Sequence, residues 1–465
     1  MTAVRVTLGW VAQVTGGALH GGETDREVGN VVTDSRMVQP GDLFIALRGP
    51  RFDAHDFVDD VVAKGASALV EAGQADRRPR NGIVEVDDTL KALQDLAHAV
   101  RQAAATRVIA ITGSAGKTTT KETIAGFLER RFTVVKNKGN LNNHIGLPLS
   151  LMQLREGPDV AVMELGMNHA GEISTLVAIA EPEVRVWTNV GDAHLGFFAS
   201  PDAIADAKAE ILERADADSL LVCNADDARV MARVGRFPGR TLTFGTSPDA
   251  DVRAVDVEDR GLDGMRARIV TRHDGERTVE TPLLGRGNLS NVLAATAVAL
   301  DSGIALDDIA VVSAQLSPAD RRGAVRRLRD GIVLIDDSYN SSPAALQRAL
   351  EVVARERRAR RKVAILGEML ELGEHAPRLH SESGSAAAAS GLGLLLTVGG
   401  APARDMATAA TAAGMPPESV SYFETSDAAA AAAVRLVRAG DVVLVKGSRG
   451  VRTDIVVDRL SAEFA

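Results

Sequence analysis

The sequence contains almost no cysteine, since Cys223 is the only one among 465 residues. A single chain can therefore form neither an internal disulfide nor a zinc site built from cysteines. Cys223 closes the apolar run LLVC at residues 220–223. A thiol buried in the protein core is the simplest interpretation.

Long apolar runs and a surplus of positive charge are also missing. No stretch of about 18 apolar residues occurs, so we expect no stable membrane insertion. Residues 1–5 lack the charged and apolar regions of a signal peptide. The formal net charge of −9 argues against a nucleic-acid partner. The basic cluster at residues 355–362 runs from a helical pattern into a strand, and we interpret it as a solvated helix end.

The chain is long and 45% hydrophobic, so two or three domains with sizeable cores are expected. Strand-like apolar runs alternate with alanine-rich helical stretches. The runs are residues 108–111, 160–163, 184–188, 220–223, 332–335, 363–366, 394–398 and 442–445. This alternation predicts an α/β fold with parallel sheets covered by helices on both faces. In such sheets, ligands bind beyond the carboxyl ends of the strands.

Three blocks divide the sequence. Residues 1–86 predict a small N-terminal α/β domain. Residues 87–320 hold most candidate site residues and predict a central parallel-sheet domain, in which the polar segment 248–281 forms an antiparallel excursion. From residue 321 to 465 the alternation restarts, which predicts a C-terminal Rossmann-like domain.

The most informative segment is VIAITGSAGKT at residues 108–118. A strand-like run ends at Thr112, a glycine turn follows, and a helical stretch comes next. Such a turn directs backbone N–H groups and a helix N-terminus at one point, where a polyphosphate binds. Lys117 then reaches the terminal phosphates, and the Thr118 hydroxyl ligates Mg²⁺. The spacing GxxGKT departs from the common GxxxxGK[ST] form, so a non-functional turn is the alternative.

Other polar residues follow strand-like runs of the same domain. Glu164 comes directly after residues 160–163 and is either a Mg²⁺ ligand or a helix-capping acid. His194 lies past the run 184–188, where a structural histidine and a metal or phosphate ligand are both open. Lys208 lies in a helical pattern, and by the residues alone it is a solvated lysine.

The segment DDSYNSSP at residues 336–343 follows a strand-like run of the C-terminal block. Serine and asparagine before a proline often only cap the next helix. The density of polar groups at a strand end favours a binding site that includes Asp337, Ser338 and Asn340.

Taken together, these motifs resemble those of the Mur ligase family. TGSAGKTTT at residues 112–120 is similar to the ATP loop of that family. Further similar segments are TDSR (33–36), the stretch 41–57, NLNNHIGLP (140–148), ELGMNHAGEI (164–173), GRGNLSN (285–291), DDSYN (336–340), LGEMLELG (366–373) and VKGSR (445–449). The resemblance covers nearly the whole chain in order. The pairing of the ELGMNHAGEI and DDSYN segments resembles the family members that add D-alanyl-D-alanine.

The resemblance implies an ATP-dependent amide ligase in the bacterial cytoplasm. Such an enzyme uses ATP and Mg²⁺ to join D-alanyl-D-alanine to the C-terminal carboxylate of UDP-N-acetylmuramoyl-tripeptide through an acyl phosphate. This step belongs to the synthesis of peptidoglycan precursors. We expect a monomer in which the C-terminal domain closes over the central one, because site residues are split between the two.

The resemblance also implies a role for individual residues. Catalytic roles are implied for Lys117, Lys208 and His194. ATP contacts are implied for Gly113, Ser114, Ala115, Gly116, Lys117, Thr118, Thr119, Asn291 (at the adenine), Arg322 and Asp337. Contacts to the uridine-nucleotide substrate are implied for Ser35, Arg36, Arg48, Asn142 and Asn143, and contacts to the dipeptide for Ser338 and Asn340. Metal ligation is implied for Thr118, Glu164, His194 and a carbamylated Lys208.

Some features depart from the family pattern or stay open. Ser341 and Ser342 stand where the family usually has alanine and asparagine, so dipeptide contacts there can differ. Arg321 is an alternative to Arg322 as the nucleotide arginine. The sequence does not decide whether the third peptide residue is diaminopimelate or lysine, nor whether Lys208 is modified.

Rival functions make distinct predictions. A sister ligase that adds a single amino acid carries an Asp-Asn-Pro-Arg motif in its last domain, and this chain has no such tetrapeptide. A phosphate-loop switch would hydrolyse ATP without an acceptor amine, but this chain carries an N-terminal block that resembles a substrate domain. A silent scaffold would not need Lys117, Thr118, Glu164 and His194.

Overall fold

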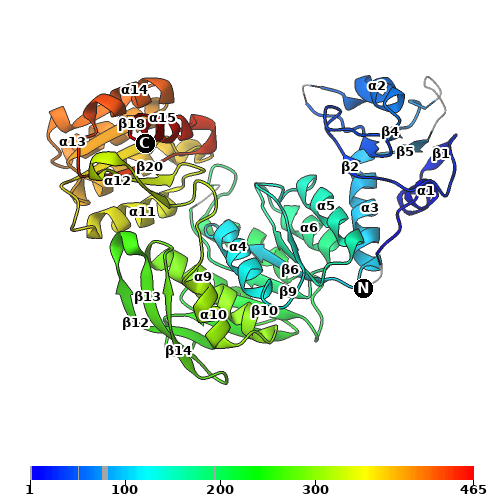
Figure 1. Ribbon diagram of the computed structural model, residues 1–465, viewed down its shortest axis with the longest axis horizontal. Coiled ribbons are helices and arrows are strands. Elements are labelled where there is room, and N and C mark those ends of the chain that lie inside the picture. Colours follow the sequence, from blue (N-terminus) through cyan, green and yellow to red (C-terminus); the bar gives the residue numbers. More distant parts are fainter. Residues whose placement is uncertain (1–2, 51, 76–81, 193–194) are drawn as a thin grey trace.

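A computed structural model describes residues 3–50, 52–75, 82–192 and 195–465. Sheets of five, nine and six strands follow one another along the chain, each combined with helices. The predicted α/β class with three sheet domains is therefore confirmed. Figure 1 shows the first and third sheets on opposite sides of the central one. No helix in these ranges is both long and apolar enough to cross a membrane.

The N-terminal domain has the strand order β1-β5-β4-β3-β2. Its elements are α1 (Leu8–Thr15), β1 (Ala18–His20), β2 (Val31–Val32), β3 (Leu43–Ile45), η1 (Ala54–Phe57), α2 (Val58–Ala63), β4 (Ser67–Glu71) and β5 (Ile83–Val86). Strands β2 to β5 pair in parallel, and β1 runs antiparallel beside β5. Ser35 and Arg36 follow β2, and Arg48 follows β3.

The central domain has the strand order β14-β13-β12-β11-β10-β9-β6-β8-β7. Its first half contains α3 (Thr89–Ala103), β6 (Arg107–Thr112), α4 (Lys117–Leu128), β7 (Val134–Lys136), α5 (Gly146–Leu151), η2 (Met152–Glu156), β8 (Val160–Glu164), α6 (Glu172–Ala180) and β9 (Val184–Trp187). Its second half contains α7 (Pro201–Ala209), η3 (Glu210–Leu212), β10 (Leu220–Asn224), α8 (Ala228–Val234), β11 (Arg240–Gly245), β12 (Val252–Asp259), η4 (Gly261–Asp263), β13 (Met265–Thr271), β14 (Glu276–Thr281), α9 (Gly285–Asp301) and α10 (Leu306–Ser313). The predicted antiparallel excursion is confirmed, since β12, β13 and β14 pair antiparallel.

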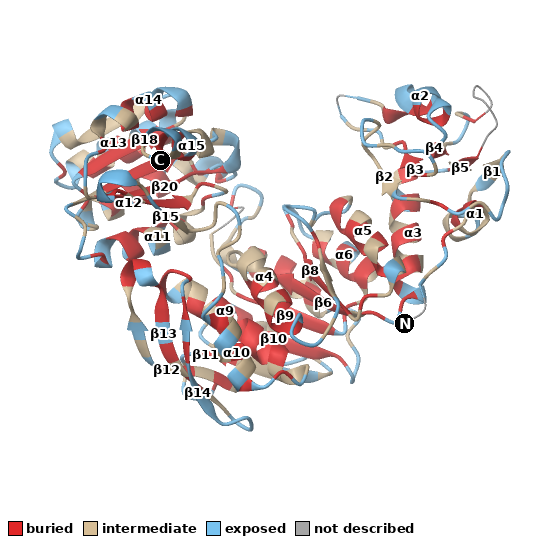
Figure 2. Cartoon of the chain, in the orientation of Figure 1, coloured by how far each residue is buried: buried red, intermediate tan, exposed pale blue. Residues whose placement is uncertain are grey.

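Both faces of the central sheet are buried in its parallel strands β6, β8, β9 and β10, whereas the antiparallel strands β12 to β14 leave one face partly exposed. Successive side chains of a strand point to opposite faces, so the apolar run in β6 supplies two cores. Val108 and Ala110 pack into one apolar cluster, and Ile109 and Ile111 into the other. Figure 2 shows the burial running along these strands. Cys223 in β10 is fully buried as predicted, and burial raises the pKa of its thiol to about 12.

The C-terminal domain has the strand order β15-β16-β20-β17-β18-β19, with β15 antiparallel to β16. Its first elements are β15 (Ala324–Arg327), η5 (Arg329–Gly331), β16 (Val333–Asp337), α11 (Pro343–Arg355), β17 (Arg361–Gly367), η6 (Gly373–His375) and α12 (Ala376–Ala389). The remaining elements are β18 (Leu394–Val398), α13 (Ala401–Ala412), η7 (Pro417–Ser419), β19 (Val420–Phe423), α14 (Ser426–Leu436), β20 (Asp441–Lys446), η8 (Arg449–Val451) and α15 (Asp454–Glu463). The domain boundaries after residues 86 and 320 stay predictions.

The basic cluster at the end of α11 is exposed, and two of its arginines also contact the central domain. Arg355 pairs with Asp259 at 2.6 Å, and Arg358 pairs with Asp263 at 2.7 Å. Both aspartates belong to the β12–η4 region of the central domain. The arginines at 355, 357, 358 and 360 are exposed, as the solvated helix end predicts. In addition, two of them contact the central domain, which the sequence did not predict.

Candidate active site

A cavity of about 870 Å³ lies between the central and C-terminal domains. The central domain lines it with the loop after β6, the start of α4, the segment after β8 and the start of α9. The C-terminal domain lines it with Arg322, the segment after β16, one side of α11 and the loop after β20. The carboxyl ends of strands from both parallel sheets thus face one space, where α/β proteins bind ligands.

Two glycines shape the phosphate loop between β6 and α4. Gly116 is the N-cap of α4 and has φ +84°, and Gly113 has φ +151°. A Cβ atom on Gly113 would lie 1.9 Å from Thr188 Oγ1, and one on Gly116 would lie 2.2 Å from Asn291 Oδ1. Only glycine fits at these two positions, because a side chain would collide as well as strain the backbone.

The end of β9 holds this loop in place. Asn189 accepts a hydrogen bond from the Ser114 backbone N–H at 3.0 Å through its carbonyl. Its side-chain amide accepts from Ala115 N–H and donates to Ala115 O, each at 2.9 Å. The first N–H groups of α4 have no acceptor within the helix, and the residues that carry them line the cavity. The N-terminus of α4 can therefore bind an anion.

Lys117 opens α4 and donates a hydrogen bond to Gly113 O at 2.9 Å. Burial lowers the pKa of Lys117 from its usual value, the Glu164 carboxylate opposes this, and the Arg322 guanidinium lowers the pKa further. Arg322 comes from the C-terminal domain. Charges from both domains therefore meet at the phosphate loop.

Thr118 and Glu164 form the pair that can hold a metal ion. The Thr118 hydroxyl donates to Glu164 Oε2 at 2.8 Å, and Asn142 Nδ2 donates to Glu164 Oε1 at 2.8 Å. Buried Asn137 fixes the backbone of Glu164 through bonds to its N–H and C=O at 3.0 Å. Mg²⁺ takes oxygen ligands and is typically held by one or two carboxylates plus phosphates, so these donors fit it. Within the described ranges, no three His, Cys, Asp or Glu residues cluster into a ready metal site.

Lys208 lies in α7 and is buried, with 1% of its surface exposed. The solvated-lysine interpretation was therefore wrong. Burial, and then the charge of Lys117, lower the pKa of Lys208 well below its usual value. Lys208 is absent from the cavity lining, although it lies close enough to Lys117 for their charges to interact. His194 falls outside the described residues.

Asn291 lies on α9 beside the phosphate loop and lines the cavity. Its Nδ2 donates to Asn288 Oδ1 at 3.0 Å, and its Oδ1 accepts from the Thr120 hydroxyl at 3.2 Å. The two asparagines thus present amide groups at one end of the cavity, next to Gly116. Thr119 lines the same region.

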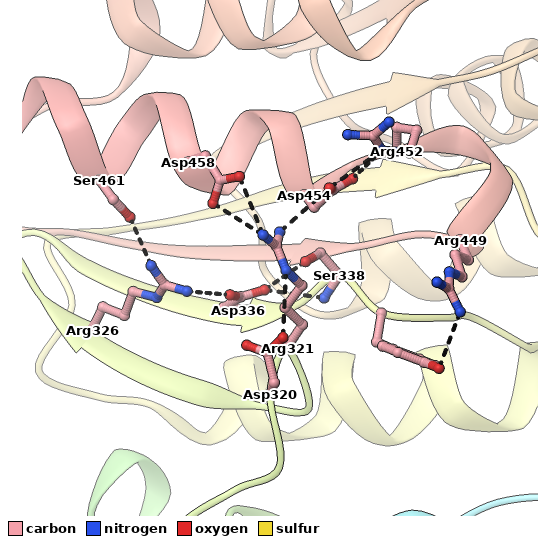
Figure 3. Close-up of polar contacts among 11 residues, drawn as sticks. Asp320, Arg321, Arg326, Asp336, Ser338, Arg449, Arg452, Asp454, Asp458 and Ser461 are labelled. Carbon is pink, nitrogen blue, oxygen red and sulfur yellow. Dashed lines mark hydrogen bonds and ion pairs between the residues drawn. The ribbon is translucent and has the colours of Figure 1, made fainter. Parts of the chain in front are cut away.

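The adjacent residues Arg321 and Arg322 point to different places. Arg321 pairs with Asp458 at 3.2 Å and with Asp454 at 3.6 Å, both on α15, as Figure 3 shows. Arg322 lines the cavity and stacks on the Tyr339 ring, 4.1 Å from the ring centre. The geometry therefore favours Arg322 over Arg321 as the arginine that meets a ligand.

The DDSYN segment places its residues unequally. Asp337 lines the cavity and accepts a hydrogen bond from Lys446 Nζ at 2.6 Å. Asn340 also lines the cavity. Ser338 is buried, its hydroxyl donates to Asp336 Oδ1 at 2.6 Å, and it does not reach the lining.

The residues predicted for the uridine nucleotide are separated in this arrangement. Asn142 and Asn143 line the cavity. Arg36 is exposed and pairs with Asp34 at 2.6 Å, while Arg48 pairs with Asp53 at 3.0 Å. Ser35, Arg36 and Arg48 belong to the N-terminal domain and do not line the cavity, because that domain stands away from the C-terminal one (Figure 1).

Several residues at the site escaped the sequence reasoning. Asn137 and Asn189 act through side-chain bonds to distant backbone, which no local pattern reveals. Tyr339 and Arg449 lie inside recognised motifs, but their contact joins two strand ends 110 residues apart. Arg348 lines the cavity from α11 together with Gln347 and Glu351. The spacing of these polar residues by three or four positions, which puts them on one face of a helix, was the signal available in the sequence.

A phosphate loop that faces a Rossmann-type domain across a shared cavity defines a nucleotide-dependent α/β enzyme. Family models match three consecutive parts of the chain: the Mur ligase family catalytic domain at residues 27–101, the Mur ligase middle domain at 111–299 and the Mur ligase glutamate ligase domain at 321–449. The chain belongs to the Mur ligase family.

Relatives and solved structures agree with this assignment over nearly the full length. The chain is 33% identical to UDP-N-acetylmuramoyl-tripeptide–D-alanyl-D-alanine ligase of Bacillus subtilis (strain 168), with 98% of both chains covered. It superposes on a crystal structure of MurF from Acinetobacter baumannii with a TM-score of 0.87 and 32% identity, covering 99% of this chain and 100% of that one. MurF ligase from Thermotoga maritima, solved in complex with ADP, gives a TM-score of 0.81 and 31% identity, with 93% and 97% covered.

Proposed function

We propose that this enzyme uses ATP to join D-alanyl-D-alanine to the terminal carboxylate of UDP-N-acetylmuramoyl-tripeptide, a step of peptidoglycan precursor synthesis in the cytoplasm. One observation carries the proposal. The Lys117 phosphate loop faces the Asp337–Asn340 segment across one cavity, in a chain similar along its length to ligases named for this reaction. The substrates are small molecules, and we propose that the enzyme acts as a monomer.

Two chemical steps account for the reaction. The substrate carboxylate attacks the γ-phosphorus of ATP, which gives an acyl phosphate and ADP. The amine of D-alanyl-D-alanine then attacks the carbonyl carbon, the amine loses a proton and phosphate leaves. The enzyme supplies positioning and charge rather than a covalent nucleophile. Lys117 and Arg322 are the cations that stabilise negative charge on the transferred group.

Thr118 and Glu164 are the proposed Mg²⁺ ligands, because a hydroxyl and a carboxylate oxygen meet beside the phosphate loop. A bound Mg²⁺ would neutralise charge on the ATP phosphates. Asn137 and Asn142 keep Glu164 oriented from behind.

Lys208 is the proposed site of carbamylation. Its burial and lowered pKa favour the neutral amine, which is the form that reacts with CO₂, and the product is a carboxylate-like metal ligand. Together with His194 it would hold a second Mg²⁺. The family resemblance and the burial of Lys208 support this role.

The remaining assignments divide between the cavity and the N-terminal domain. Asn291 is the proposed adenine contact, and Asn340 the proposed dipeptide contact. Ser35, Arg36 and Arg48 are proposed to bind the uridine nucleotide from the N-terminal domain. That placement requires the domains to approach one another, so that water is excluded from the labile acyl phosphate.

The proposal is tested by determining product masses after incubation with ATP, Mg²⁺ and UDP-N-acetylmuramoyl-tripeptide. D-Alanyl-D-alanine should yield a product heavier by the dipeptide minus water, with the diaminopimelate and lysine forms of the nucleotide compared. Ligation of a single amino acid in its place would indicate a sister ligase. ATP hydrolysis without any ligated product would overturn the proposal.

A further inference from the structure

Arg449 is an unassigned cation on the C-terminal wall of the cavity. It follows β20 at the carboxyl edge of the sheet, and its side chain is exposed and lines the cavity. In the described part of the chain, Arg449 forms no ion pair with a carboxylate. It therefore presents a guanidinium charge to whatever fills this end of the cavity.

Tyr339 holds this guanidinium in place. The Arg449 guanidinium carbon lies 5.5 Å from the centre of the Tyr339 ring, and Arg449 Nη1 donates to the tyrosine hydroxyl at 3.4 Å. Arg322 lies 4.1 Å from the centre of the same ring. One ring thus attracts two guanidinium groups, which would otherwise repel each other. Figure 3 shows Arg449 apart from the network that Arg321 forms with Asp454 and Asp458.

Six other lysines and arginines of the described chain line the cavity, and they differ from Arg449 in partner or in place. Arg355 pairs with Asp259 at 2.6 Å, and Arg286 lies at the start of α9 on the central-domain wall. Lys446 is paired with Asp337 at 2.6 Å. Lys117 and Arg322 meet at the phosphate loop, where the charge of Arg322 reaches Lys117. Arg348 packs against Gly287 at the start of α9, near the amide end of the cavity. Arg449 lies on the C-terminal wall, where the adjacent Gly450 approaches Leu370 and where Asn340 also lines the cavity.

The acceptor substrate needs such a cation. A dipeptide carries an amine, which must reach the acyl phosphate, and a free carboxylate, which must be held away from the negative phosphates. A guanidinium pairs with a carboxylate through two parallel hydrogen bonds, which fixes direction as well as distance. A single anchor at Arg449 would therefore orient the amine toward the centre of the cavity.

We propose that Arg449 binds the free carboxylate of the incoming D-alanyl-D-alanine, and that Tyr339 is a positioning residue that holds its guanidinium there. The proposal rests on the proposed function, because it names the subsite for the acceptor of that reaction. It assigns Arg449 to acceptor recognition and not to ATP.

The test compares D-alanyl-D-alanine with D-alanyl-D-alaninamide, which has the same amine and no carboxylate. Arg449→Met should raise KM for D-alanyl-D-alanine about 10- to 100-fold, the loss typical of a hydrogen-bonded charge pair. KM for the amide and KM for ATP should be the same in the variant and the wild type. An Arg449→Met variant that raises KM for both acceptors equally, or for neither, would overturn the proposal.

Matched variants separate binding from general damage. Arg452→Met removes a neighbouring arginine that pairs with Asp454 at 3.1 Å and does not line the cavity, so KM should not change. Tyr339→Leu removes both the ring and the hydroxyl that accepts from Arg449 Nη1, so it should raise KM for the dipeptide more than for the amide. Tyr339→Phe removes the hydroxyl alone and should raise KM for the dipeptide by less than Tyr339→Leu does. A Tyr339→Leu variant that affects both acceptors alike would contradict the positioning role. Wild-type enzyme that ligates neither acceptor would instead refute the proposed function itself.

Discussion

Lys117 is the side chain on which phosphoryl transfer depends most. Lys117→Ala should lower turnover about 10²- to 10³-fold, because the transferred group loses its fixed positive charge. Steady-state phosphate release measures the effect, and circular dichroism should show an unchanged fold, since a partly buried lysine is removed rather than introduced. Lys91→Ala, at an exposed lysine of α3 paired with Asp95, is the control and should leave turnover unchanged. Near-normal turnover in Lys117→Ala would contradict the phosphate-loop assignment.

The sequence predicted the location of some site residues and not of others. Lys117 and Thr118 follow a local strand–glycine–helix pattern, and the structure brings both to the cavity. Arg321 and Arg322 are adjacent and chemically alike, so the sequence could not separate them. Their difference comes from α15, whose Asp454 and Asp458 lie more than 130 residues further along the chain.

At the scale of elements, the glycine loop between β6 and α4 makes the sharpest prediction. Gly116→Ala should reduce turnover about 10²-fold through misplacement of the loop, because the new Cβ would collide with Asn291 Oδ1. ATP binding measured by calorimetry should weaken in parallel. Gly275→Ala is the matched control, since Gly275 also has a positive φ of +79° but has no atom within 4 Å of the added Cβ. Equal effects of the two substitutions would show that backbone strain alone, and not the collision, is responsible.

The docking of α11 onto the central domain predicts an acid-sensitive contribution to stability. Burial alone would raise the pKa of Glu356, but hydrogen bonds from Arg358 and Leu262 outweigh it and hold that pKa below its usual value. This contribution is complete above the unfolded pKa of Glu356 and is lost as pH falls through the lower folded pKa. Glu356→Gln should therefore cost about 1–3 kcal/mol of stability near neutral pH.

Denaturant unfolding of wild type and Glu356→Gln at a series of pH values measures this contribution. The difference between them should be constant from neutral pH down to the unfolded pKa and should shrink below it. Glu382→Gln, in an exposed pair with Arg378 on α12, should change stability by less than about 0.5 kcal/mol. A difference for Glu356→Gln that grows on acidification would contradict the argument.

Elements were predictable where their signal is local. Apolar runs bounded by glycine or polar residues located strands β6, β8, β9, β10, β16, β17, β18 and β20. Strands β7, β11, β15 and β19 lie outside those runs and were not located. The exposure of the cluster at residues 355–362 was predictable, but its pairing was not, because Asp259 and Asp263 lie about 100 residues earlier in the chain. A run of charged residues in a sequence indicates an exposed surface. It does not reveal which distant residues of opposite charge form ion pairs with that surface.

At the scale of the whole molecule, the central and C-terminal domains are in contact, and the N-terminal domain stands away from the C-terminal one. Ser35 and Arg36 lie in a domain that does not contribute to the cavity, although the substrate must reach from the uridine site to the phosphate loop (Figure 1). The order of the domains followed from the sequence, but their relative placement did not, because it depends on a few contacts such as Gly196 N–H to Glu371 O at 2.9 Å.

Binding of an ATP analogue together with the nucleotide substrate and the dipeptide should therefore compact the enzyme. Small-angle scattering should show the radius of gyration falling toward about 23 Å, the value for a compact globule of this length. The ATP analogue alone should give a smaller change, since it does not engage the N-terminal domain. A radius unaffected by the complete set of ligands would contradict domain closure.

The transfer of oxygen from the substrate carboxylate to phosphate distinguishes acyl-phosphate ligation from simple ATP hydrolysis. The measurement uses UDP-N-acetylmuramoyl-tripeptide labelled with ¹⁸O in its terminal carboxylate, together with ATP, Mg²⁺ and D-alanyl-D-alanine, and determines the mass of the released phosphate. We predict one labelled oxygen in each phosphate and the other in the new amide, in step with product formation. Unlabelled phosphate would mean that water, and not the substrate carboxylate, attacks ATP, and would contradict the ligase mechanism.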